Sequence, residues 1–290
     1  MDALVSTAWL ARELAEAGGP GGCGAAPPRI VDVRYYLDPA RRGRDAYRAG
    51  HLPGAVFLDM DQDLSAPGGG RNLPTGRHPW PSEEQVARVM SAAGIGPGVR
   101  VVAYDDASGG TAARLWYLLR AHGHDEVAVL DGGIDRWRAE GRPLSTDEPS
   151  VAPAAFAARL RPGFVVAKPE MVRSHAGRLV LDARVAPRYR GESEPIDPRA
   201  GHVPGARNAP WTDNLTSEPV PVFRSPEELR ARYEALGAGR EPAVVYCGSG
   251  VTACHDLLAL HLAGLGGTLY AGSWSEWSSD AELPAATGSE

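Results

Sequence analysis

The chain has 290 residues, of which 43% are hydrophobic and 23% charged, proportions typical of a globular protein with one large domain or two ordinary ones. Its formal net charge of −6 argues against a nucleic acid or an anionic membrane as a partner. No apolar run approaches the roughly 18 residues of a membrane span and no signal peptide is evident, so we expect a cytoplasmic protein without membrane contact.

Short β-branched runs alternate with helical patterns along the chain. The strand-like runs are, in order, IVDV (30–33), VRVVAY (99–104), VAVL (127–130), LVLDA (179–183), AVVY (243–246) and TLY (268–270). The clearest helical patterns are SEEQVARVMSAAG (82–94), in which Ser82 is placed to cap the helix, TAARLWYLLRAHG (111–123) and SPEELRARYEALG (225–237). This alternation predicts an α/β fold in which a mostly parallel sheet is flanked by helices.

The two halves of the chain can be aligned with each other. Four segments match in the same order at offsets of about 140–150 residues: 29–36 with 178–189, 49–59 with 200–210, 99–115 with 242–258, and 129–137 with 269–277. The second pair is AGHLPGAVFLD and AGHVPGARNAP. We therefore predict one duplicated domain, with a first copy over 1–145, a Pro/Ala-rich linker over 146–162 and a second copy over 163–290.

One cysteine stands where a predicted strand ends and a predicted helix begins, in YCGSGVTACHD (246–256). The glycines around Cys247 let backbone N–H groups turn inward, and the helix N-terminus adds positive potential, so this loop favours a thiolate or a bound anion. A cysteine phosphatase is disfavoured because Ala253 replaces the arginine of its Cys-x5-Arg loop. The aligned turn of the first half has Asp105 or Asp106 where the second half has Cys247, so we expect the first domain to be catalytically inactive.

The other cysteines, Cys23 and Cys254, make no disulfide framework with Cys247, and a reducing compartment fits all three. No histidine and cysteine cluster has the spacing of a metal site, so no metal is expected.

CGSGVTA (247–253), the paired GH(L/V)PGA motifs, DARVAPRYRGESEPID (182–197) and GSWSEW (272–277) together resemble the two-domain rhodanese sulfurtransferases over essentially the whole chain. The resemblance implies two tandem rhodanese-like domains, of which the second carries the active cysteine. It also implies transfer of a sulfane sulfur from a small-molecule donor to Cys247 as a persulfide. It further implies that the sulfur passes to a thioredoxin-like protein, another dithiol or cyanide, and that no organic cofactor is needed.

The loop sequence resembles the 3-mercaptopyruvate branch of that family, because Gly248 and Ser249 place no basic residue directly after the cysteine. In that branch the loop serine works with a histidine and an aspartate of the first domain. By motif these are His78 in GRHPW and Asp61 in FLDMD, and the three are expected to move a proton as the carbon–sulfur bond breaks.

The resemblance also assigns substrate-binding residues. Arg188 matches the arginine that grips the donor's carboxylate, and the loop residues Gly248, Gly250, Val251 and Thr252 surround the sulfur. A second arginine of the mercaptopyruvate branch falls at Ile196 in this chain, and Arg199 is near enough in sequence to replace it. This departure leaves thiosulfate:cyanide sulfurtransfer as an alternative, and a persulfide carrier or regulatory module without turnover as a more remote one.

Overall fold

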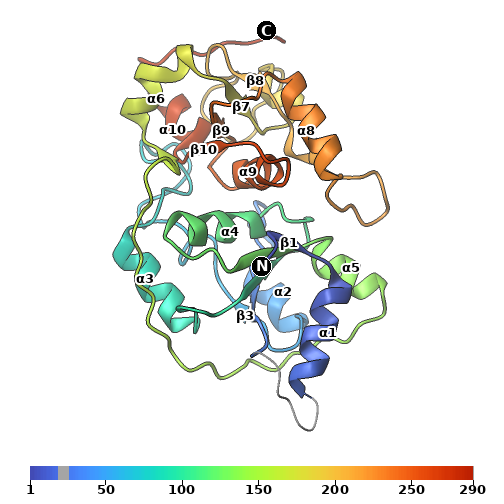
Figure 1. Cartoon of the computed structure of the whole chain (residues 1–290). Coiled ribbons are helices and arrows are strands. Elements are labelled where there is room, and N and C mark those ends of the chain that lie inside the picture. The colour runs from blue at the N-terminus through green and yellow to red at the C-terminus, as the bar shows by residue number, and fades with distance from the viewer. Residues whose placement is uncertain (19–25, 290) are drawn as a thin grey trace.

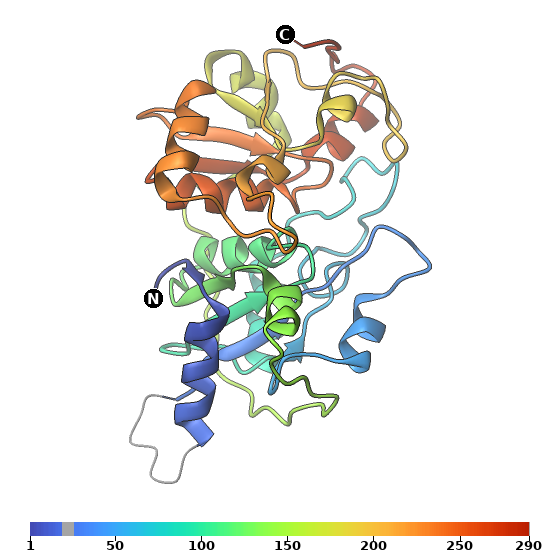
Figure 2. The same cartoon turned by 90° about the vertical axis from the view of Figure 1, so that its right-hand side faces the viewer.

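A computed structural model describes residues 1–18 and 26–289, so Cys23 lies outside the described residues. The chain forms two lobes stacked along one axis, each built on its own sheet of five strands (Figures 1 and 2). Every strand pair in both sheets is parallel, and helices cover the sheets. The predicted α/β class with two similar domains is confirmed.

The first sheet has the strand order β1-β5-β4-β2-β3. Its strands are β1 (Leu4–Val5), β2 (Arg29–Asp32), β3 (Val56–Phe57), β4 (Val101–Tyr104) and β5 (Val127–Leu130). Its helices are α1 (Thr7–Gly18), α2 (Gly43–Ala49), α3 (Glu83–Ala92), α4 (Ala112–Ala121) and α5 (Gly133–Ala139). The predicted cap of α3 is present, because the Ser82 hydroxyl accepts a hydrogen bond from the Gln85 amide at 3.2 Å.

The second sheet repeats this order as β6-β10-β9-β7-β8. Its strands are β6 (Val165–Val166), β7 (Val180–Asp182), β8 (Arg207–Asn208), β9 (Ala243–Tyr246) and β10 (Gly267–Tyr270). Its helices are α6 (Lys168–Ser174), α7 (Ala186–Tyr189), α8 (Pro226–Ala235), α9 (Ala253–Leu262) and α10 (Ser273–Ser279), with 3₁₀ turns η1 (His175–Gly177) and η2 (Trp211–Asn214).

Matching buried interactions support the duplication seen in the sequence. His51 stacks on Tyr47 with ring centroids 3.9 Å apart, and His202 stacks on Tyr189 at 3.8 Å. Both histidines are buried in equivalent places of the two domains, one of which lacks the cysteine. A structural role explains their repetition better than a catalytic one.

The two domains pack through α4 and α9, which face each other at the junction of the lobes (Figure 1). Buried apolar side chains of the two helices, such as Leu115 and Leu258, belong to one continuous cluster that crosses the junction. The Tyr117 hydroxyl of α4 also donates to the Phe164 carbonyl of the second domain at 2.6 Å. Because this shared core is apolar, the domains are held in a fixed relation, and a site between them can be well ordered.

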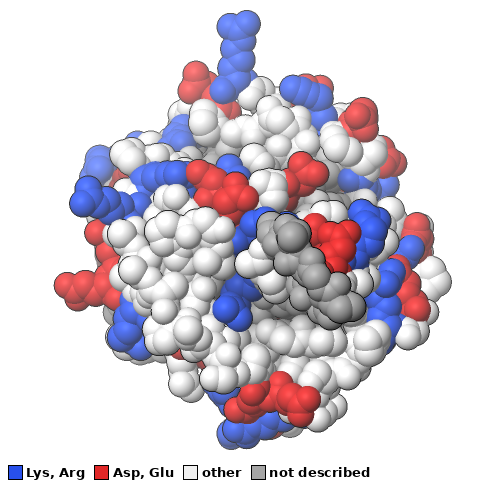
Figure 3. Space-filling view, turned by 60° about the horizontal axis from the view of Figure 1, so that its bottom comes forward, with Lys and Arg blue, Asp and Glu red and all other residues white. Residues whose placement is uncertain are grey.

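Residues 146–161 have no regular secondary structure and run along the outside from the first lobe to the second (Figure 1). Among the described residues, no helix is long and apolar enough to cross a bilayer. Figure 3 looks at one end of the molecule, where arginine and acidic side chains are interspersed rather than gathered by sign.

Candidate active site

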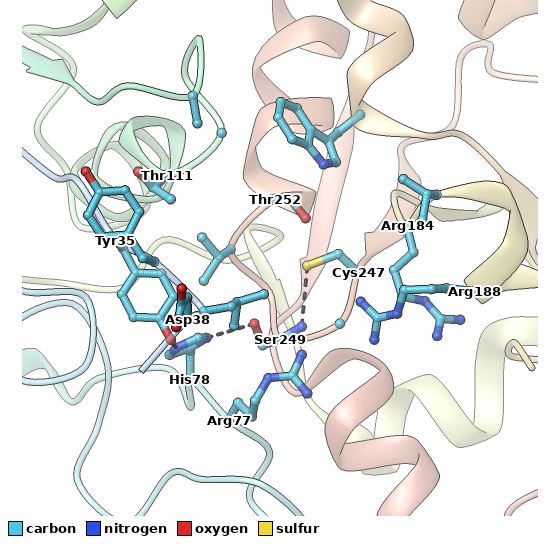
Figure 4. A pocket seen from close by; sticks show the side chains of 18 of the residues that line it. Tyr35, Asp38, Arg77, His78, Thr111, Arg184, Arg188, Cys247, Ser249 and Thr252 are labelled. Carbon is cyan, nitrogen blue, oxygen red and sulfur yellow. Dashed lines mark hydrogen bonds between the residues drawn. The ribbon is translucent and has the colours of Figure 1, made fainter. Parts of the chain in front are cut away.

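A cavity of about 400 Å³ lies between the domains, and Cys247 is part of its wall. The second domain contributes Arg184, Val185, Arg188, Trp211 and the loop residues Cys247, Gly248, Ser249, Val251 and Thr252. The first domain contributes residues from three loops: Tyr35, Tyr36, Leu37, Asp38, Arg41, Arg77, His78, Ala107, Gly110 and Thr111. Figure 4 shows the labelled members of this wall converging from both sides. The cavity therefore exists only where the two domains meet.

Cys247 follows the last residue of β9, and its sulfur is enclosed by the turn that leads into α9. The Sγ atom accepts hydrogen bonds from the Gly250 amide at 3.1 Å and the Ser249 amide at 3.5 Å. The residue is only 2% exposed, and the N-terminus of the ten-residue helix α9 follows directly. These donors and the helix dipole favour negative charge on the sulfur, as expected for a nucleophilic thiolate.

Two positions of the loop require glycine for different structural reasons. Gly250 has φ +77°, and a Cβ there would lie 2.5 Å from the Ala271 carbonyl oxygen, so both backbone conformation and space require glycine. Gly248 has no such φ, but a Cβ on it would lie 2.6 Å from Nη2 of Arg77. Gly250 thus shapes the sulfur's surroundings, and Gly248 makes room for a guanidinium.

The predicted relay residues Ser249, His78 and Asp61 are brought together from both domains. His78 Nδ1 lies 2.7 Å from the Ser249 hydroxyl oxygen, and its Nε2 lies 3.0 Å from an Asp61 carboxylate oxygen. The Tyr35 hydroxyl is also 3.2 Å from Nε2. His78 is buried, whereas the side chain of Asp61 is 61% exposed.

This geometry sets the protonation of His78. A carboxylate can only accept, so Nε2 carries the hydrogen that is donated to Asp61, and Nδ1 is free to accept the Ser249 hydroxyl proton. Burial lowers the pKa of His78 below its usual value, and the hydrogen bond to Asp61 opposes that shift only in part. His78 is therefore neutral at pH 7 and able to take a proton.

Arg188 of α7 also reaches the cavity, as predicted. Its Nε and Nη2 bind Glu194 at 3.1 and 2.7 Å, and Nη2 binds Asp197 at 2.9 Å. Its Nη1 lies 3.4 Å from the position that a Cβ of Gly248 would take. Two carboxylates thus hold the guanidinium while one of its edges faces the cavity beside Cys247 (Figure 4).

The structure does not bring Arg199 into the cavity. Its guanidinium donates to four backbone carbonyls around the C-terminal end of α10, those of Trp277, Ser278, Asp280 and Leu283. With all three nitrogens so occupied, Arg199 stabilises the fold of the second domain and is unavailable to a donor. The expectation that it replaces the second arginine of the mercaptopyruvate branch is a misassignment, because closeness in sequence does not fix where a side chain points.

The sequence analysis did not identify two arginines of the first domain that lie at the site. Arg77, next to His78, lines the cavity and pairs with Asp197 of the second domain. Arg114 of α4 is fully buried beneath the active loop, where its Nη1 donates to the Gly250 carbonyl at 3.1 Å and its Nη2 donates to the carbonyls of Leu64 and His78 at 3.3 Å. The GRHPW motif offered one signal, a basic residue beside the candidate histidine.

Cys254 lies on α9 with its thiol 3.3 Å from the same Gly250 carbonyl. Burial raises the pKa of Cys254 to about 12, so the thiol keeps its proton and remains a donor to the loop.

The corresponding turn of the first domain holds a carboxylate in place of sulfur. Asp105 Oδ1 accepts from the amides of Ala107 and Gly109, both at 2.9 Å. Its Oδ2 accepts from the amides of Thr111 and Ala112 at 2.7 and 2.8 Å, and from the Thr111 hydroxyl at 3.0 Å. The loop is therefore an anion cradle filled by its own side chain.

A family model for the Rhodanese-like domain matches residues 8–140 and again residues 169–280. The chain belongs to the rhodanese family. Each match covers four of the five strands of one sheet, and the second match contains Cys247.

Similar proteins include members named for both donors. The chain is 46% identical to a probable 3-mercaptopyruvate sulfurtransferase of Pseudomonas aeruginosa, over 89% of this chain and 92% of that one. It is 38% identical to a putative thiosulfate sulfurtransferase of Mycobacterium tuberculosis, over 90% and 92%. The solved 3-mercaptopyruvate sulfurtransferase of Leishmania major superposes with a TM-score of 0.79 at 31% identity, over 96% of this rhodanese and 74% of that chain.

Proposed function

We propose that this rhodanese is a 3-mercaptopyruvate sulfurtransferase that works through a persulfide on Cys247. The thiolate attacks the donor's sulfur, and the sulfur–carbon bond breaks with its electron pair on carbon. The proton of the donor's thiol is carried to that carbon, so the products are pyruvate and the Cys247 persulfide. An acceptor thiolate or cyanide then attacks the outer sulfur and restores the Cys247 thiolate.

The observation that carries the proposal is the contact of His78 with Ser249, two residues after the nucleophile. Breaking a carbon–sulfur bond leaves a basic enolate carbon, which needs a proton within reach. His78 takes up the proton of the donor's thiol through the Ser249 hydroxyl, and it returns a proton through the same hydroxyl to the carbon while Asp61 holds its ring. Thiosulfate releases sulfite instead, and that step needs no such proton.

Charge and hydrogen bonding in the cavity support the other assignments. Arg188 binds the donor's carboxylate, and Gly248, Gly250, Val251 and Thr252 form the loop around the sulfur. The acceptor is a thioredoxin-like protein or another dithiol, and the protein acts in the reducing cytoplasm, where such acceptors are kept reduced.

The test is pyruvate release from 3-mercaptopyruvate, with dithiothreitol as acceptor, by the wild type, Cys247→Ser and His78→Ala. Cys247→Ser should abolish turnover, and His78→Ala should lower kcat by about 10²–10⁴-fold, the range for loss of a general acid–base group. Thiosulfate turnover in the same His78→Ala protein is the matched control and should fall far less.

Thiosulfate sulfurtransfer is the second candidate, favoured by the arginines that line the cavity and by relatives named for that donor. Faster turnover with thiosulfate than with mercaptopyruvate would replace the proposed donor. A stable extra sulfur on Cys247 by mass spectrometry, without multiple turnover for either donor, would instead identify a persulfide carrier.

A further inference from the structure

The loop that carries His78 is clamped onto the second domain. In Figure 2 it rises from the first lobe to the second. The Arg77 amide donates to the Ser275 hydroxyl of α10 at 3.1 Å, and a Cβ on Gly76 would lie 2.9 Å from the Gly272 carbonyl. The side chain of Arg77 therefore enters the cavity from the first domain at a fixed place.

Arg77 is nearly buried yet has unused donors. The residue is 8% exposed, its Nη1 pairs with Asp197, and its buried Nε has no hydrogen-bond partner. Its Nη2 faces Gly248, the residue after the nucleophile. A buried guanidinium with open donors is costly unless an anion completes its hydrogen bonding.

Arg188 approaches the same point from the other side. Its Nη1 and the Nη2 of Arg77 lie 3.4 and 2.6 Å from the position of a Cβ on Gly248, and the Asp197 carboxylate joins the two guanidinium groups. Figure 4 shows Arg77 and Arg188 on either side of the loop beside Cys247. The pair forms a two-sided clamp one residue from the sulfur, where the carboxylate of a three-carbon donor would lie.

We propose that Arg77 is the second carboxylate-binding arginine of this site, supplied by the first domain. It takes the role of the second arginine of the mercaptopyruvate branch, whose aligned position is occupied by Ile196 in this chain. Because Arg77 comes from the first domain, selection of the donor depends on contact between the domains. The inference rests on the proposed function for the identity of the donor, but carboxylate recognition itself can be measured without any donor.

The test compares alkylation of Cys247 by iodoacetate and by iodoacetamide, which differ in carrying a carboxylate or a neutral amide. Both reagents consume the thiolate, so the ratio of their second-order rate constants is independent of how much thiolate is present. The rates are followed by mass spectrometry of the peptide that contains Cys247. Arg71→Met is the matched control, since Arg71 lies exposed on the same loop.

The wild-type ratio should exceed that of 2-mercaptoethanol in the same buffer, and Arg77→Met should lower it at least fivefold while Arg71→Met leaves it unchanged. For turnover, Arg77→Met should raise KM for mercaptopyruvate by about 10–100-fold, the loss of a charge-assisted hydrogen bond, with kcat within about threefold. Adding Ile196→Arg to Arg77→Met should recover part of the lost affinity.

Should Arg77→Met fail to fold, Gly248→Ala gives the same test, because its Cβ displaces the Arg77 guanidinium without disturbing a left-handed backbone. An unchanged alkylation ratio in folded Arg77→Met, or in Gly248→Ala where Arg77→Met does not fold, would overturn the inference. A ratio that falls in Arg77→Met, in a protein that does not turn over mercaptopyruvate, would uphold Arg77 as a carboxylate site and reject the proposed donor.

Discussion

Replacing Gly250 by alanine tests whether the amides around Cys247 create the reactive sulfur. At φ +77° an alanine is in the left-handed region, which costs roughly 1–2 kcal/mol. Its Cβ would also lie 2.5 Å from the Ala271 carbonyl oxygen, a backbone atom that cannot swing aside. Overpacking of this kind costs about 1–3 kcal/mol, so we expect a total of about 2–5 kcal/mol.

At about 2–4 °C per kcal/mol, that loss corresponds to a fall in Tm of roughly 4–20 °C. Chemistry should suffer more than stability, because the Gly250 amide donates to the sulfur at 3.1 Å and would be displaced by the same shift. We therefore expect Gly250→Ala to form the Cys247 persulfide at least 100-fold more slowly, from mercaptopyruvate and thiosulfate alike.

Gly248→Ala is the matched control, with the same added methyl group two residues away. Its Cβ meets the end of the Arg77 side chain rather than backbone, so Tm should stay close to that of the wild type and only carboxylate binding should weaken. Differential scanning calorimetry and single-turnover persulfide formation measure the two effects. Equal behaviour of the two variants would refute the distinct roles given to the two glycines.

Three further predictions follow from buried titratable groups. The acid limb of kcat for mercaptopyruvate should lie below pH 6.5, because burial lowers the pKa of His78, and a pH–rate profile with a limb above that value would contradict the relay. Burial raises the pKa of Asp256 to about 7, whereas an unfolded carboxyl ionises near pH 3.9. The folded protein therefore loses stability as the pH rises through this range, because the buried carboxyl resists ionisation. Asp256→Asn should leave the free energy of unfolding unchanged at pH 4 and increase it by about 1–3 kcal/mol at pH 8. Urea denaturation of the wild type and Asp256→Asn at both pH values measures the free energies of unfolding, and an equal gain in stability at pH 4 and pH 8 would contradict this prediction. Arg114→Met should cost about 2–4 kcal/mol more than Arg120→Met on the same helix, because buried carbonyls lose their donor; equal urea midpoints for the two variants would oppose this.

The sequence predicted those parts of the site that depend on local structure. Cys247 could be placed at the end of a strand because AVVY precedes it and a helical pattern follows, and the glycines indicated a tight turn. The contact of His78 and Asp61 with Ser249 came from family motifs alone, since 171 residues separate His78 from its serine partner.

The position of Arg77 depends on how the domains meet, and for that reason sequence analysis missed it. The loop around it contains many glycines and no regular structure, and its path is set by contacts such as that with Ser275 in the other domain. The role predicted for Arg199 was wrong for a related reason. Its guanidinium donates to four backbone carbonyls at the end of α10, and no local sequence pattern indicates these contacts. Side-chain direction in irregular segments is fixed by tertiary contacts.

The carboxylate of Asp105 makes the turn of the first domain differ from the equivalent turn of the second. In the first domain the anion is part of the polypeptide and can never leave, so that loop is always in its filled state. In the second domain the same place holds the Sγ atom of Cys247, which accepts hydrogen bonds from the amides of Gly250 and Ser249. The loop of the first domain therefore carries its own anion, and it places Thr111 in the wall of the cavity that Cys247 also lines. The domain with Asp105 at this turn therefore still takes part in the site, because its loops form one side of the cavity.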